Sequence, residues 1–330
     1  MRLRCPATAG ALSLALISNQ ALAQVAASPD GAPVDRSPHV ERFLDINGVR
    51  LQLLDWGGHG PVILFMPGFG NGAHIFDGLA PEFTDRFHAL AITPRGFPPS
   101  SAPDRGYTVA QLAQDVRAVL DSLQASKAVL VGHSISGAVL TRFATLHPDR
   151  LLAAVYLDGA YDFGDAYRRS QEARREAPQP PADTTASAFQ SWRRRFPDWD
   201  SVREIDSGMW NIDSAETARR QALVKSLVTE VRSHPNEVWR VQAPALSVCA
   251  LGSMERGFGW LTPDSARWKM ASRYASQVLH RKHEVCEEFA RKVPRGRVVD
   301  LDSGHYVFLD QRLAVVRAMR EFLDDVVENR

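Results

Sequence analysis

Three short stretches of the sequence carry residue types that together could perform nucleophilic catalysis. The first, Gly132-His133-Ser134-Ile135-Ser136-Gly137, follows an apolar run. Small residues two positions from a serine let a helix backbone pass close to a strand, so the serine takes a strained conformation and its hydroxyl stands clear of the sheet. Ser136 occupies a position where such an elbow usually has glycine, which a small side chain can tolerate. The stretch predicts Ser134 as the nucleophile, with a bare tight turn as the alternative.

A histidine near the C-terminus could activate that serine. His305 lies in the stretch Asp302-Ser303-Gly304-His305-Tyr306, after the last strand-like run. A loop in this place can reach back over the sheet edge to the elbow. The neutral imidazole of His305 can take the serine proton and return it to the leaving group. We therefore predict His305 as the general base, with an ordinary exposed loop histidine as the alternative.

The third stretch, Met66-Pro67-Gly68-Phe69-Gly70, comes directly after another apolar run. Glycine-rich backbone can turn its N–H groups toward a developing oxyanion, and a helix N-terminus favours the same negative charge. The expected oxyanion hole consists of the backbone N–H groups of Phe69 and Ile135. A plain turn is the alternative.

The elements that must position these residues alternate between strands and helices. Two alternating runs within residues 43–56 flank Asn47-Gly48, which predicts a hairpin. Further strands are expected at residues 62–66, 89–93, 128–131, 151–157, 245–250 and 297–301, and helices at residues 108–123, 135–146, 263–293 and 313–327. Strands that are apolar on both faces, separated by helices, predict an α/β fold with a mostly parallel sheet flanked by helices.

The chain divides into five segments. Residues 1–23 resemble a signal peptide, because Arg2 and Arg4 precede a short apolar run and Ala21-Leu22-Ala23 fits the cleavage rule. A buried N-terminal helix is the alternative. Residues 24–40 read as a flexible lead-in, residues 41–162 and 241–330 as two parts of the core, and residues 163–240 as an inserted helical cap. Cleavage after Ala23 predicts a periplasmic or secreted protein.

The composition limits the partners. A formal net charge of +1 gives no reason to expect nucleic acid or an anionic membrane as a partner. No dinucleotide-binding glycine motif is present and the histidines lack metal-ligand spacing, so no cofactor, no metal and no integral membrane segment after processing are expected. The oligomeric state stays open. Cys249 lies in an apolar strand-like run and Cys286 in a helical stretch, which favours two buried thiols over a bridge.

The order of these motifs resembles the α/β-hydrolase superfamily across residues 41–330. The matching stretches are Ile46-Asn47-Gly48-Val49, Pro67-Gly68-Phe69-Gly70, Pro94-Arg95-Gly96-Phe97, the Gly-His-Ser elbow, His147-Pro148-Asp149-Arg150 and Gly304-His305. The segments 155–161 and 304–308 look like those of exported bacterial members. One departure is Pro67, where the family usually has histidine, so the loop loses one side chain and keeps the backbone donor of Phe69.

The resemblance offers two positions for an acid that would orient His305. Many members carry an aspartate after the strand at residues 245–250, where this chain has only Glu255. Haloalkane dehalogenases and zearalenone-type lactone hydrolases carry it at the strand end that corresponds to Asp158. The resemblance favours Asp158 as the third catalytic residue, with Glu255 as the alternative acid and Asp162 or no acid as remaining possibilities.

Together these residues predict a serine hydrolase that cleaves a carboxylic ester or lactone of a small to medium, largely apolar substrate through an acyl-enzyme. A dehalogenase needs an aspartate nucleophile, against which Ser134 argues. The alternatives are a catalytically silent binding module with this fold, or an amidase or perhydrolase that uses the same triad. The substrate-binding residues are unknown from the sequence, although Trp192, Trp199 and Trp210 of the cap could contact a small-molecule substrate.

Overall fold

The computed structural model describes residues 37–174, 178, 189–191 and 212–328. The predicted signal peptide, most of the predicted lead-in and the tryptophans Trp192, Trp199 and Trp210 lie outside these residues.

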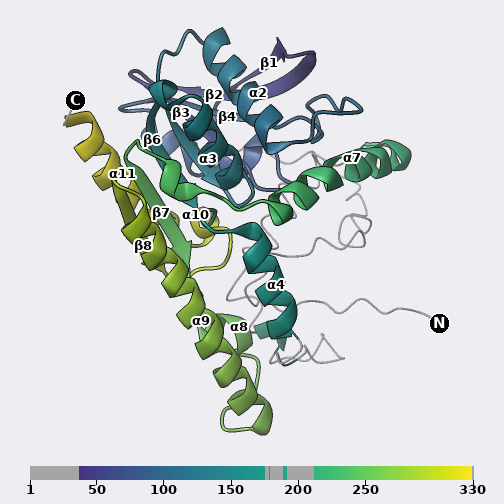
Figure 1. Cartoon of the computed structure of the whole chain (residues 1–330), viewed down its shortest axis with the longest axis vertical. Coiled ribbons are helices and arrows are strands. Elements are labelled where there is room, and N and C mark those ends of the chain that lie inside the picture. The colour runs from purple at the N-terminus through teal and green to yellow at the C-terminus, as the bar shows by residue number, and fades with distance from the viewer. Residues whose placement is uncertain (1–36, 175–177, 179–188, 192–211, 329–330) are drawn as a thin grey trace.

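One sheet of eight strands forms the centre of the protein, in the order β1-β2-β4-β3-β5-β6-β7-β8 (Figure 1). The β1–β2 and β2–β4 pairs are antiparallel, and every other pair is parallel. The α/β fold with a mostly parallel sheet is therefore confirmed. The strands are β1 (Val40–Ile46), β2 (Val49–Gly57), β3 (Val62–Met66), β4 (His88–Ile92), β5 (Ala128–His133), β6 (Leu151–Leu157), β7 (Ala245–Ala250) and β8 (Gly296–Leu301).

The middle strands are apolar on both faces because helical layers cover both faces of the sheet. Every residue of β3, β5 and β6 is buried. Leu130 of β5 points into the core under helices α2 (Val109–Ser122), α3 (Ser136–Leu146) and α9 (Ala266–Lys292). Its neighbours Val129 and Val131 point into a second core with α10 (Val307–Asp310), α11 (Arg312–Glu328) and the 3₁₀ turns η1 (Ala73–Phe76) and η2 (Ala80–Phe83).

The elements begin and end close to the predicted residues, with local exceptions. Strand β5 continues through His133, so it reaches the residue before the predicted nucleophile. Helix α9 begins at Ala266, because the Ser265 side chain caps it by accepting from the N–H of Trp268 at 3.1 Å. Figure 1 shows α9 running from beside β7 and β8 to a point well beyond the sheet. The short helix α8 (Met254–Phe258), which packs against α9, was not predicted.

Helices α4 (Phe163–Arg174) and α7 (Ser214–Ser233) fall within the predicted cap, residues 163–240, and they contact each other. Helix α7 also contacts α2, and its Glu230 carboxylate accepts from the N–H of Val109 at 2.9 Å. The division of the chain at residues 163 and 240 stays a prediction.

The prediction of two separate thiols is wrong. Cys249 of β7 and Cys286 of α9 form a disulfide, with Cα atoms 6.6 Å apart. Helix α9 packs along β7 and β8, so a buried residue on the helix meets a residue of the strand. The sequence shows that each cysteine lies in an apolar element, but it does not show which side of the helix faces which strand.

A buried ion pair fixes the loop after β4, and we expect its loss to destabilise the fold. Arg95 donates from Nε and Nη2 to the two oxygens of Asp115 at 2.6 and 2.7 Å, and both side chains are 4% exposed. Replacing Asp115 by alanine leaves a buried guanidinium unpaired, so we expect the free energy of unfolding to fall by about 3 kcal/mol. Urea denaturation measures this change.

The matched control is Asp121→Ala on the same helix. Asp121 is 44% exposed and pairs with Arg150 at 2.7 Å, so we expect a loss below about 1 kcal/mol. Equal losses for the two substitutions would show that the buried pair contributes no more to the free energy of unfolding than the exposed pair.

Candidate active site

Ser134 lies on a sharp turn between β5 and α3. Its φ is +52°, a left-handed conformation that a residue other than glycine rarely adopts. The turn is held from both sides: the N–H of Ser134 donates to the carbonyl of Leu157 at 3.1 Å, and its own carbonyl accepts from the N–H of Gly137 at 2.8 Å. This is the strained backbone that a nucleophile elbow requires.

The small residues around the elbow are needed because backbone segments touch there. A Cβ at Gly132 would lie 2.8 Å from the carbonyl oxygen of Ser136, and one at Gly137 would lie 2.0 Å from that of Gly159. Ser136, which departs from the usual glycine, has a contact of its own. Its hydroxyl donates to the carbonyl of Pro67 and so joins the start of α3 to the loop after β3.

The loop of residues 67–70 packs directly on the elbow. A Cβ at Gly68 would lie 2.7 Å from Nδ1 of His133 and 3.1 Å from Cβ of Ser134, so only glycine fits. Phe69, the next residue, is partly buried, and its ring meets that of Phe97 edge-on at 5.5 Å. Ile135 is buried at the N-terminus of α3. The two predicted oxyanion donors thus belong to adjoining segments of the backbone.

His305 lies in the loop after β8 and is hydrogen-bonded to Asp158, which follows β6. The distance from Nδ1 of His305 to Oδ2 of Asp158 is 2.6 Å. Since an ionised carboxylate only accepts, Nδ1 must donate, which leaves Nε2 of the neutral ring as the nitrogen without a proton. The other Asp158 oxygen accepts from the N–H of Ala250 at 3.3 Å.

Asp158 is ionised although it is buried. Burial alone would raise the pKa of this carboxyl, but the Lys282 ammonium and the hydrogen bond from His305 outweigh it, so the pKa lies below its usual value. The Lys282 Nζ is 3.9 Å from Oδ2 of Asp158. Like Ser134, Asp158 has a positive φ, here +45°, which an aspartate tolerates better than most residues.

The structure brings Asp158, and not Glu255, to His305. Glu255 is exposed on the first turn of α8. Asp162, a further possibility, accepts from the N–H of Asp165 at 2.7 Å and so begins helix α4.

A buried arginine that sequence reasoning missed supports the loop of His305. Nη2 of Arg256 lies 2.8 Å from Oδ2 of Asp310, and the same oxygen accepts from the N–H of Gly304 at 3.0 Å. Arg256 is 8% exposed. No motif could have indicated this contact, because it joins α8 to α10 across the end of the sheet.

Comparison with known proteins places the chain in a family. A model of the alpha/beta hydrolase family matches residues 63–318. The chain belongs to the alpha/beta hydrolase family. Its similarity to a solved alpha/beta structure, a probable hydrolytic enzyme from Pseudomonas aeruginosa, has a TM-score of 0.62 at 20% identity and covers 87% of this chain and 95% of that one.

Two curated proteins match part of this alpha/beta hydrolase. The 2-(acetamidomethylene)succinate hydrolase of Mesorhizobium japonicum is 30% identical over 119 residues, which are 36% of this chain and 42% of the relative. Epoxide hydrolase A of Mycobacterium tuberculosis is 36% identical over 121 residues, which are 36% of this chain and 38% of the relative. The matches therefore span less than half of either relative.

His133 is a second feature of this alpha/beta hydrolase that sequence reasoning missed. It is fully buried, and burial together with the nearby His305 lowers its pKa well below the usual value. Its Nε2 is 3.1 Å from the backbone carbonyl of His305, so it must donate there. The two rings are 4.7 Å apart. The residue before the predicted nucleophile thus holds the loop that carries the predicted base.

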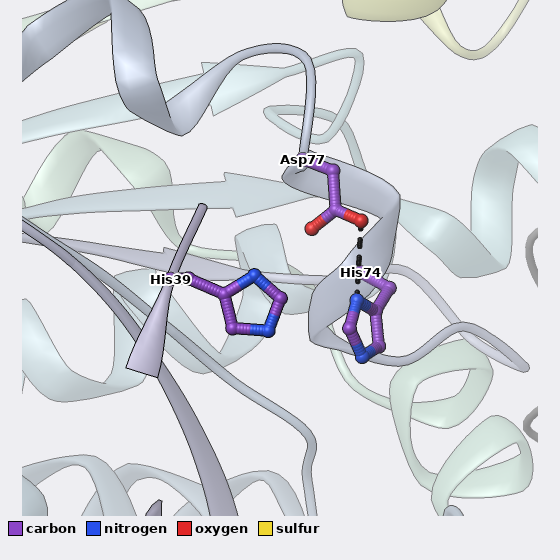
Figure 2. Close-up of side chains that lie close together, drawn as sticks. All are labelled: His39, His74 and Asp77. Atoms are coloured by element: carbon purple, nitrogen blue, oxygen red, sulfur yellow. Dashed lines mark hydrogen bonds and ion pairs between the residues drawn. The ribbon is translucent and has the colours of Figure 1, made fainter. Parts of the chain in front are cut away.

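One group of donor atoms in this alpha/beta hydrolase is close enough to be considered for a metal ion. His39, His74 and Asp77 point toward one another at the surface (Figure 2), with one potential ligand atom of each within 4.8 Å of the others. However, His74 Nδ1 is hydrogen-bonded to Asp77 at 3.1 Å, and His39 Nδ1 to the carbonyl of Ser37 at 3.0 Å. The three side chains thus form a partly exposed hydrogen-bonded cluster, and we assign no ion to it.

A second such group contains both disulfide sulfurs, together with Asp300, and oxidised sulfurs are not thiolate ligands. Across the part of the chain that the structure describes, no helix combines the length and the apolarity needed to cross a membrane.

Proposed function

We propose that this chain is a serine hydrolase that needs no cofactor and cleaves a carboxylic ester or lactone through an acyl-enzyme. The observation that carries the proposal is the combination of Ser134 on a strained elbow with His305 hydrogen-bonded to the buried Asp158 at 2.6 Å. Fold alone would not support an activity, because the same fold serves many functions. The chemistry of these side chains carries the proposal.

In the proposed reaction, Asp158 holds the Nδ1 proton of His305 and leaves Nε2 as the base. His305 takes the proton of Ser134 as its hydroxyl oxygen attacks the substrate carbonyl. The backbone N–H groups of Phe69 and Ile135 would stabilise the resulting oxyanion. His305 then protonates the departing alcohol, and a water molecule that it activates releases the acid from Ser134.

The type of nucleophile decides between bond classes. The names of the curated relatives cover different bonds, an epoxide among them. Displacement at an epoxide or halide carbon by Ser134 would give an ether, which water does not cleave under these conditions. Attack on a carbonyl gives an ester, which a second attack by water resolves. The serine therefore favours acyl transfer.

Some apolar side chains remain partly exposed on the core that also contains residues of the elbow helix α3. Phe69, Tyr161, Ile212 and Leu223 are partly buried and pack against the same core as Ile135. Phe69 belongs to the loop after β3 and Tyr161 to the segment after β6, whereas Ile212 lies just before α7 and Leu223 in its middle. We propose that these side chains favour a substrate with a largely apolar acyl or alcohol group.

We also propose that the protein is exported and begins at Gln24 after cleavage. The arginine-rich start with its cleavage pattern supports this, and so does the Cys249–Cys286 disulfide, which is stable in an oxidising compartment. N-terminal sequencing of protein from a periplasmic or culture fraction should read from Gln24. An uncleaved protein found in the cytoplasm would contradict export.

The decisive experiment combines a substrate panel with a serine-directed probe. Purified protein, dialysed against a chelator, should hydrolyse members of a panel of acyl esters and lactones and react with a fluorophosphonate. Mass spectrometry should then find the phosphonate on Ser134. Folded protein that neither turns over any member of the panel nor reacts with the probe would favour the silent binding module.

A further inference from the structure

Lys282 of α9 reaches the residue that orients the proposed base. Its Nζ donates to the backbone carbonyl of Ala250 and lies 3.9 Å from Oδ2 of Asp158, the oxygen that also accepts from His305. The N–H of Ala250 in turn donates to the other oxygen of Asp158. The lysine, the end of β7 and the carboxylate therefore form a closed set of contacts, with the lysine side chain 29% exposed.

The disulfide lies next to these contacts. Cys249 directly precedes Ala250 in β7, and Cys286 comes one helical turn after Lys282 on the same side of α9. The bridge thus ties together the strand end and the helix turn between which Lys282 reaches Asp158.

We propose that Lys282 is a positioning residue for catalysis, which keeps Asp158 ionised and aimed at His305, and that the Cys249–Cys286 disulfide holds Lys282 in that place. The inference rests on the proposed function, because it concerns the acid of the same triad.

The charges that face Asp158 explain why the lysine matters. His305 approaches from the loop after β8, His133 from β5, Tyr161 from the segment after β6 and Lys282 from α9. Burial keeps His133 uncharged, and burial with the nearby Asp158 carboxylate raises the pKa of Tyr161, so that group is neutral as well. Among these described groups, Lys282 supplies a lasting positive charge while His305 is neutral.

The positive charge of Lys282 determines in which direction its loss changes the pH dependence of activity. A positive charge close to a carboxylate favours the ionised form, so removing the ammonium raises the pKa of Asp158. Asp158 then takes up a proton at a higher pH and no longer holds the Nδ1 proton of His305, so activity is lost earlier as the pH falls. An opposite charge nearby usually shifts a carboxyl pKa by about one to three units, and for a partly exposed lysine we expect the lower end, about one pH unit.

The test is the pH profile of kcat/KM for an ester that the parent protein hydrolyses. In Lys282→Met, the acidic limb should move up by about one pH unit, with activity below the limb lower by about tenfold and the high-pH plateau within about threefold of the parent. Lys282→Arg, which keeps the charge, should restore the limb. Lys269→Met removes an exposed lysine from the same helix and should leave the profile unchanged.

The disulfide is tested in two backgrounds. Replacing Cys249 and Cys286 together by serine should move the acidic limb in the same direction in the parent, and should add no further movement in Lys282→Met. The dependence on background separates an effect through Lys282 from a general loosening of α9. Thermal melting of each variant checks that it is folded. If Lys282→Met does not fold, the variant without the disulfide still tests the proposal.

The outcomes separate the two proposals. If the parent is not labelled by the fluorophosphonate, the proposed function fails. If Ser134 of the parent is labelled and the limb of Lys282→Met does not move, or kcat/KM falls equally at every pH, the role of Lys282 is overturned. If the acidic limb of the parent does not move when both cysteines are replaced by serine, the role of the disulfide is overturned.

Discussion

Replacing Ser134 by alanine should lower turnover by about ten-thousandfold or more and abolish labelling by a fluorophosphonate. The hydroxyl that would be acylated is lost, and the remaining groups can only polarise the substrate. The fold should be unaffected, because the Ser134 contacts that hold the elbow are made by its backbone. Initial rates on the best ester of the panel and mass spectrometry of labelled protein measure both effects.

Ser122→Ala is the matched control. Ser122 is exposed at the end of α2, and its hydroxyl donates only locally, to the carbonyl of Val119. This variant should keep the rate and the labelling of the parent. A Ser134→Ala protein that still carries the phosphonate on another serine would remove Ser134 from the mechanism.

Replacing Asp158 by asparagine should lower kcat by up to about ten-thousandfold, the cost seen for this change in a serine protease. The carboxylate holds the Nδ1 proton of His305, whereas an amide can present its own N–H to that nitrogen and turn the ring to the wrong tautomer. The size and shape of the side chain are kept, so the loss should appear in kcat while thermal melting stays close to that of the parent.

Glu255→Gln makes the same chemical change at the alternative position. Since Glu255 is exposed on α8, this variant should stay within about tenfold of the parent. If Glu255→Gln is inactive and Asp158→Asn is active, the acid comes from the segment after β7, and Asp158 only shapes its own loop.

Residue types alone were enough to find the strands and the strand ends at which the catalytic residues are proposed. Strands such as β3 and β6 are continuous buried runs, so their bounds appear directly in the sequence. Parallel strands place their carboxyl ends at one edge, which is why Ser134, Asp158 and His305 could be expected to converge. The resemblance to a family was needed to choose Asp158 over Glu255.

Contacts that depend on how a helix lies over the sheet could not be predicted. Lys282, Cys286 and Arg256 meet their partners only because α8 and α9 pack across the ends of β7 and β8 at a particular rotation. Periodicity indicates which side of a helix is apolar, but not which strand residue that side will meet. The same reason led the two cysteines to be interpreted as separate thiols.

The hydrogen bond from His133 to the carbonyl of His305 also determines how an acidic limb can be interpreted. Because His133 stays neutral well below the pH at which histidines usually gain a proton, this bond does not change across the neutral range. The elbow and the loop of the proposed base are therefore joined by a contact that does not titrate in that range. A loss of rate in that range is then not expected to come from protonation of His133.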